Sequence, residues 1–213
     1  MDNWQYPEIE TPENREDYIS LGKKLRQLFR EWSSKTWTDI KEEDGIKLSE
    51  FYLDNSSIPV LKITKIFKNV KPERLIDLNF NCTFDQKKST NPDLIDYKII
   101  DNPDTNRVVA YSQYSAPFGV SNREFLYFQE LWQNNGVSMI ITQSVNIKKF
   151  PFSPSYVRGI ITSFYVIDEV AEGTRFSMIN HVDPKGWIPG FIINSYKEKE
   201  MTKMRTIETL VKE

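Results

Sequence analysis

The chain of 213 residues has very little of the usual machinery of covalent or metal chemistry. It contains one cysteine, Cys82, and one histidine, His181. No intrachain disulfide can form, and one residue of each type cannot build an ordinary structural zinc site. The sequence also lacks a Gly-x-Ser-x-Gly motif, a P-loop, a Gly-x-Gly-x-x-Gly motif and a His-Glu-x-x-His motif. We therefore expect no enzymatic activity and no bound cofactor or metal.

Long apolar runs and a charge of one sign are missing as well. No stretch approaches the run of about 18 apolar residues that indicates a membrane-spanning helix. The formal net charge is −2, so nothing favours nucleic acid as a partner. The N-terminal segment is polar and acidic and does not resemble a signal peptide. Together with the lone cysteine, this favours a reducing compartment. We expect a cytoplasmic monomer with one domain over residues 1–213 and a core over about 12–212.

Aromatic residues are plentiful, at 13% of the chain. Such a content is typical of a well-filled core, and it also suits a core that leaves room for an apolar guest. The composition alone keeps both interpretations open.

Helical spacing predicts one helix over 12–33, with Thr11 as its cap, a short one over 71–79 and a long one over 188–212. The first carries an apolar stripe that includes Leu21, Leu25 and Leu28. In the last helix, Glu200 falls within the apolar arc. A lone carboxylate there lies either at the margin of the buried face or in a polar spot of a cavity.

Between these helices, short runs separated by turn residues predict strands. They are 37–43, 46–53, 59–67, 94–100, 107–115, 123–132, 137–148, 156–168 and 174–183. Their short connections, such as Asp44-Gly45, predict antiparallel pairing. The runs 137–147 and 156–167 are apolar on both faces, which predicts a sheet that is covered on one face and packs against something on the other. The fold class is therefore α+β, with one curved antiparallel sheet around a terminal helix.

Three stretches resemble one known family. Residues 111–128 (YSQYSAPFGVSNREFLYF) are similar to its strand, proline-containing omega loop and Arg-Asp-aromatic strand start, here Arg123-Glu124-Phe125. Tyr156-Val157-Arg158 resembles its next strand motif, and 180–194 (NHVDPKGWIPGFIIN) resembles the junction before its last helix. On these stretches the chain resembles the START (StAR-related lipid transfer) domain family, and its omega-loop segment is most similar to the phosphatidylcholine-binding branch.

The resemblance implies a helix-grip fold that holds one lipid in an internal tunnel, without enzymatic activity, and moves it between membranes. A lipid-sensing module and, as a third alternative, an enzyme of the wider helix-grip superfamily remain open. In the family, the C-terminal helix and the omega loop form a lid that opens at a membrane. Here these segments are 188–212 and 115–122. The residues expected at the lid and the membrane are Phe118, Val120, Trp187, Ile188 and Phe191.

Strand alternation from Arg123 places the side chains of Phe125, Tyr127 and Gln129 on one face. The residues that we predict to contact lipid are Tyr111, Gln113, Phe125, Tyr127, Gln129, Gln143, Arg158, Asn180, Tyr196, Glu200 and Met204.

The resemblance does not identify the lipid. The arginine of the sterol-reading pair in the family falls on Gln129, and no carboxylate stands at 110–112, where its partner belongs. The choline cage falls on Ser112, Phe125 and Thr162, and the phosphate-binding arginine falls near Asn81. The expected ligand is a phospholipid, another acyl lipid or a sterol.

Overall fold

The structure is a computed structural model that describes residues 10–54, 56–148, 150, 153–187 and 189–212. Within these residues, helices and strands follow the predicted order, except that a short helix is added at Phe84–Thr90 and the predicted strand 156–168 is divided into two strands. The helices are α1 (Arg15–Ser33), α2 (Pro72–Asn79), α3 (Phe84–Thr90) and α4 (Gly190–Lys212). The strands are β1 (Thr38–Glu43), β2 (Ile46–Tyr52), β3 (Pro59–Phe67), β4 (Leu94–Asp104), β5 (Arg107–Tyr114), β6 (Arg123–Asn134), β7 (Val137–Ser144), β8 (Val157–Arg158), β9 (Ile160–Val170) and β10 (Gly173–Asp183).

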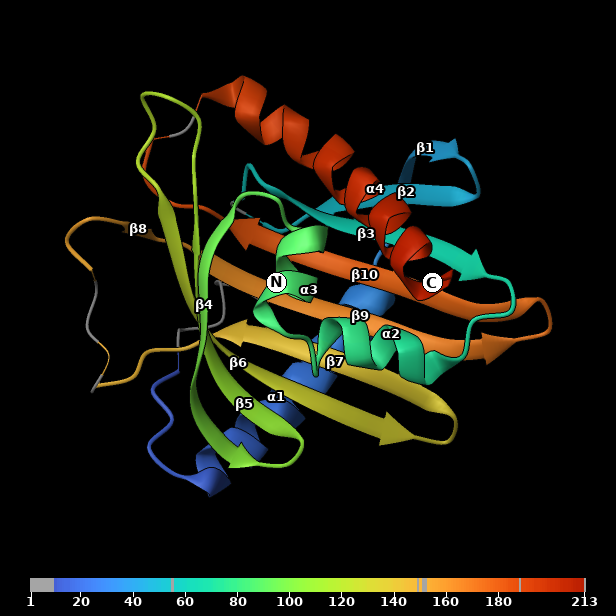
Figure 1. The fold of residues 1–213 in the computed structure, drawn as a ribbon, viewed down its shortest axis with the longest axis horizontal. Helices are drawn as coiled ribbons and strands as arrows, with labels where there is room; N and C mark the ends of the chain where they lie inside the picture. Colours follow the sequence, from blue (N-terminus) through green and yellow to red (C-terminus); the bar gives the residue numbers. More distant parts are fainter. Residues whose placement is uncertain (1–9, 55, 149, 151–152, 188, 213) are drawn as a thin grey trace.

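All these strands belong to one sheet, in the order β1-β2-β3-β10-β9-β7-β6-β5-β4. Every pair along this path is antiparallel, as the short connections predict. The exception is the two-residue β8, which pairs with β6 in parallel. Strand β3 pairs with β10, the last strand, so two segments that are far apart in the sequence lie side by side (Figure 1).

The sheet is covered on both faces, as the doubly apolar strands predict. Helix α1 crosses one face, while α2, α3 and α4 lie over the other (Figure 1). The first face carries the cluster that includes Leu25, Phe128 and Phe164, and the second carries the cluster that includes Ile63, Phe176 and Ile207. Because side chains alternate along a strand, neighbouring residues of β6, β7, β9 and β10 contribute to opposite clusters.

Helix α1 is held to the sheet by a buried charge network. Its cap is Asn14, which forms a capping box with Asp17; the prediction of Thr11 was wrong because the first turn begins later. Further along the helix, Arg26 donates to Glu130 of β6 at 2.5 Å, and Arg107 of β5 donates to the same carboxylate at 2.5 Å. Glu130 is buried, so its charge depends on both arginines.

Two other differences concern the region around β4. Helix α3 was missed, although Thr83 and Gln86 form the capping box that marks its start. A turn was predicted at Asn102-Pro103-Asp104, but β4 continues through Asp104 with irregular pairing to β5. Proline fits there because it lies at a register shift, where a ladder hydrogen bond is not required.

Cys82 and His181 do not meet. Cys82 lies beside the helices of the α4 face, while His181 projects to the α1 face, where its ring contacts Trp32 edge-on. His181 is buried, and the hydroxyl of Ser56 lies 3.4 Å from its Nε2. Both residues are structural in this arrangement. No helix in the described part of the chain is long and apolar enough to cross a bilayer.

A substitution at Gly22 tests whether the contact of α1 with Glu130 stabilises the fold. A Cβ added at Gly22 would overlap the Glu130 carboxylate, which two arginines hold in place. We expect Gly22→Ala to lower the free energy of unfolding by about 1–2 kcal/mol, because the overlap outweighs the better helix propensity of alanine. Urea unfolding measures this. The control is Lys23→Ala at the exposed neighbouring position, and equal stability of the two variants would contradict the anchor.

His181 makes stability depend on pH. Burial, opposed by a backbone hydrogen bond at Ile58 and by Asp183, lowers the pKa of His181 from 6.5 to about 4. The unfolded chain therefore takes up a proton first, and stability is lost as the pH falls from about 6.5 towards 4. We expect a loss of roughly 3 kcal/mol from this group. Urea unfolding at pH 7 and pH 4.5 should show a smaller loss for His181→Gln than for the wild type; equal losses would contradict the assignment.

Candidate functional site

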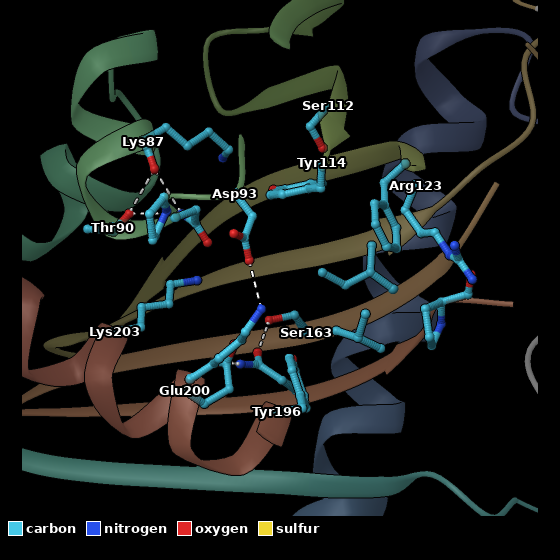
Figure 2. Close-up of a pocket in the computed structure, with 18 of the residues that line it drawn as sticks. Lys87, Thr90, Asp93, Ser112, Tyr114, Arg123, Ser163, Tyr196, Glu200 and Lys203 are labelled. Atoms are coloured by element: carbon cyan, nitrogen blue, oxygen red, sulfur yellow. Dashed lines mark hydrogen bonds and ion pairs between the residues drawn. The ribbon is translucent and has the colours of Figure 1, made fainter. Parts of the chain in front are cut away.

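A cavity of about 680 Å³ lies between the sheet and the helices of the α4 face (Figure 2). Its floor is made by β5, β6, β7, β9 and β10, and its cover by α3, α4 and the loop 115–120. A single cavity of this size is within the range of small-molecule sites, roughly 300–1,000 Å³. Its apolar wall includes Leu78, Val120, Phe125, Ile161, Val182 and Ile192.

Six of the predicted lipid-contacting residues line this cavity. Phe125, Tyr127 and Gln129 project from β6, as alternation from Arg123 predicts, and Asn180 projects from β10. Tyr196 and Glu200 enter from α4, one turn apart (Figure 2). That they contact lipid remains a prediction, but their position is the one that such a role requires.

Tyr111, Gln113 and Arg158 were wrongly assigned to the cavity. The Tyr111 hydroxyl donates to Glu124 at 2.5 Å, and Gln113 donates to the Tyr111 hydroxyl at 2.7 Å. Arg158 also pairs with Glu124, at 2.7 Å. Glu124 lies next to Phe125 in β6 and so projects to the α1 face. These residues form a structural network there, which ties β8 to β6.

Gln143 and Met204 were wrongly assigned as well. Gln143 accepts a hydrogen bond from Thr162 at 2.7 Å on the α1 face, which also removes Thr162 from the expected choline cage. Met204 is fully buried among core side chains such as Ile63 and Ile207, beyond the cavity. Helical spacing identifies the buried face of α4, but it does not say where along the helix the core ends and the cavity begins.

Glu200 occupies a polar spot of the cavity rather than the margin of the helix. Asn180 donates to its Oε2 at 2.7 Å, and Ser163 donates to the amide oxygen of Asn180 at 2.6 Å. Burial, together with the charge of Glu200, raises the pKa of the Tyr196 hydroxyl well above its usual value. The chain thus fixes one carboxylate with hydrogen bonds from its own side chains.

Two lysines in the cavity were not predicted. Lys87 enters from α3 and Lys203 from α4, and their side chains reach into the same space (Figure 2). The ammonium of Lys203 donates to the Tyr165 hydroxyl at 2.9 Å. That of Lys87 lies 4.6 Å from the ring centroid of Tyr97. Lys87 was not predicted because helix α3 was not predicted. Lys203 was not predicted because a lysine in an amphipathic helix gives no signal that its side chain faces inward.

Gln129 also has unused hydrogen-bonding capacity. Its amide nitrogen donates to Thr142 at 3.3 Å, while its Oε1 has no partner within the described residues. A buried acceptor without a donor is rare in a filled core, and its desolvation costs free energy. A hydrogen bond donated to Gln129 Oε1 by a ligand or a water molecule would explain this arrangement.

Arg123 joins the two loops at one end of the cavity. Its guanidinium donates to the carbonyls of Ser121, Pro184 at 3.0 Å, Lys185 at 2.9 Å and Trp187 at 3.3 Å. The omega loop and the segment before α4 are therefore held together, as the resemblance implies for a gate.

The residues predicted to face a membrane differ in their exposure to solvent. Phe118 is fully exposed at 107% of its reference area, and Trp187 is 73% exposed. Val120 instead lines the cavity. Ile188 and the side chain of Phe191 lie outside the described residues.

Two observations concern groups that could bind a metal ion or transfer a proton. Among the described residues, no group of three or more His, Cys, Asp or Glu side chains could hold a metal ion. His181 and Glu200 lie on opposite faces of the sheet, so they cannot act as an acid–base pair.

Comparisons with known proteins agree with the fold. The START domain family model matches residues 61–209. The phosphatidylcholine transfer protein of Bos taurus is 22% identical over 168 residues, covering 76% of this chain and 77% of that protein; the one from Rattus norvegicus is 21% identical over 164 residues, covering 74% and 75%.

Solved structures show the same fold. Human STARD10 superposes with a TM-score of 0.77 at 18% identity, covering 97% of this chain and 82% of that one. Human StAR-related lipid transfer protein 5 superposes with a TM-score of 0.81 at 16% identity, covering 93% and 98%. With the family model spanning most of the sheet and the C-terminal helix, this chain belongs to the START domain family.

Proposed function

We propose that the protein binds one lipid in the cavity and carries it between membranes without altering it chemically. The observation that carries this proposal is the large cavity, walled by apolar side chains and covered by α4. The family and the phosphatidylcholine transfer proteins that the chain resembles support it. His181 and Glu200, the two residues of the enzyme alternative, lie on opposite faces of the sheet, which favours carriage over a reaction that needs both.

Helix α4 is anchored unevenly, which suits a lid. Its second half buries Met201, Met204, Ile207 and Val211 in the core. Before these residues, Ile192 and Ser195 line the cavity. Lys199 pairs with Asp93 across the rim at 2.8 Å, and both side chains are half exposed. An exposed ion pair contributes at most about 1 kcal/mol, and the partly buried pair of Lys197 with Glu50 at 2.5 Å is a further contact that must break before the first half of α4 moves away while the second half stays.

The membrane contact that we propose rests on Phe118 and Trp187. Both are exposed, and Arg123 holds the loops that carry them beside the start of α4. Transfer of such a side chain into a bilayer interface contributes about 1.5–3 kcal/mol if it is fully buried. Contact at these loops would place the weakly anchored half of α4 at the membrane. We further propose a cytoplasmic, single-domain monomer, supported by the lone Cys82 and the continuous sheet.

Lipid occupancy is the first test. Native mass spectrometry of the purified protein, after incubation with liposomes, should show one lipid per chain. Ile161→Trp fills the cavity wall and should reduce uptake at least tenfold, whereas Ile40→Trp, on the exposed edge strand β1, should not. Absence of lipid in every preparation would contradict the proposal, and a chemically changed lipid would favour the enzyme alternative.

Transfer is the second test. Phe118→Asp combined with Trp187→Asp should slow lipid movement between vesicle populations by about tenfold or more, because the loss of apolar contact weakens membrane docking. Equilibrium binding of lipid should change little, since both side chains are exposed. Ile40→Asp is the control. Tight binding by the wild type without any transfer would instead favour a lipid-sensing module.

A further inference from the structure

The cavity contains two ammonium groups, those of Lys87 and Lys203, with one carboxylate, that of Glu200, acting on Lys203. Lys87 contacts the rings of Tyr97 at 4.6 Å and Tyr127 at 5.8 Å. Lys203 contacts the hydroxyl of Tyr165 at 2.9 Å and its ring at 5.4 Å. Neither forms an ion pair with a carboxylate in the described part of the chain. Both side chains are half-buried, and charges that are partly removed from water are commonly paired with an opposite charge.

Both side chains remain charged. Burial works against the ammonium of Lys203, but Tyr165 and Glu200 outweigh it, so the pKa of Lys203 is raised. The pKa of Lys87 is also raised despite burial, by its interactions with Cys82, Tyr97 and Tyr114, while Lys203 lowers it. The side chains of Lys87 and Lys203 reach into the same space (Figure 2). Glu200 offsets a single positive charge and is already hydrogen-bonded to Asn180.

Neutral hydroxyls surround the two cations. Burial raises the pKa values of Tyr114 and Tyr127, so at neutral pH both keep their protons and can donate hydrogen bonds. The Tyr165 hydroxyl accepts from Lys203, which leaves its own proton for another acceptor. Cations and hydroxyl donors at one end of a cavity are complementary to an anion.

A quaternary ammonium is poorly matched to the same place. Its recognition needs free aromatic faces and a cation-free surrounding. Here the rings of Tyr97, Tyr127 and Tyr165 already contact lysine ammonium groups. A choline head would displace these contacts and meet two like charges.

We propose that the lipid carried is anionic, with its phosphate or carboxylate bound between Lys87 and Lys203 and hydrogen-bonded by the surrounding tyrosine hydroxyls. This inference rests on the proposed function and adds the class of headgroup. Figure 2 supports its position: both lysines lie at the opposite end of the drawn residues from Arg123 and the gate loops. The headgroup therefore lies deep, with the acyl chains towards the gate.

The test is a competition within one membrane. Protein is incubated with vesicles of equimolar phosphatidylcholine and phosphatidylglycerol, separated from them, and its bound lipid is identified by native mass spectrometry. Because both lipids share one surface, recruitment to the membrane is the same for both. We expect the wild type to prefer phosphatidylglycerol at least tenfold, because charge-assisted hydrogen bonds contribute a difference in binding of that size.

The decisive variant is Lys87→Gln/Lys203→Gln, which should lose that preference while still taking up lipid. The matched control is Lys23→Gln/Lys35→Gln, which removes the same charge from exposed positions on and beside α1 and should keep the preference. A second arm with oleate in place of phosphatidylglycerol separates a carboxylate from a phosphate ligand.

Stability gives an independent readout. Without lipid, Lys87→Gln/Lys203→Gln should unfold at the same temperature as the wild type or higher, because unpaired buried cations do not stabilise the fold. Uptake of the two lipids in vesicle proportion by the wild type, or an unchanged preference in the cavity variant, would overturn the inference while lipid binding still stands. Absence of any bound lipid would overturn the proposed function instead.

Discussion

The architecture depends on one constraint: the central strands are apolar on both faces, so both faces of one sheet must be kept from water. A single helix, α1, covers one face and packs its stripe directly on the strands. The other face is wider than α4, and the short helices α2 and α3 complete its cover. The space left between a curved sheet and helices that contact it only partly is the cavity. The hollow interior is thus a consequence of covering a large sheet with few helices.

Polar residues are distributed between the two faces according to what each face must do. On the α1 face, charges are paired within the chain: Glu130 with two arginines, and Glu124 with Arg158 and Tyr111. Such networks fix geometry within the chain. Buried polar atoms without a hydrogen-bond partner in the described residues occur on both faces, for example Arg107 Nε on the α1 side and Gln129 Oε1 in the cavity. In the cavity a ligand can reach them, and there Lys87 and Lys203 lie against tyrosines.

The sequence predicts the fold better than the site, for a physical reason. Period-two alternation along β6 correctly places Phe125, Tyr127 and Gln129 together, because the pleat leaves no alternative. The same rule could have excluded Tyr111 and Gln143, had the register between strands been known. Register depends on pairing between distant segments, such as β3 with β10, and no local pattern encodes it. Lys87 was not predicted as a cavity residue because its helix, α3, is short and polar. The local signal for this helix is the Thr83–Gln86 capping box.

The position of Lys203 on α4 connects the headgroup site to the lid. Lys203 lies between Met201 and Met204, in the half of the helix that is anchored in the core. Lys199 and Ile192 lie in the half that closes the rim and the cavity. If the first half lifts at a membrane, as we propose, the ammonium of Lys203 keeps its place. In this mechanism a lipid headgroup would enter through the opened end and move towards a fixed positive site, and the acyl chains would follow until α4 closes over them. The charge that we propose to select the ligand is thus separated, along one helix, from the contacts that would release it.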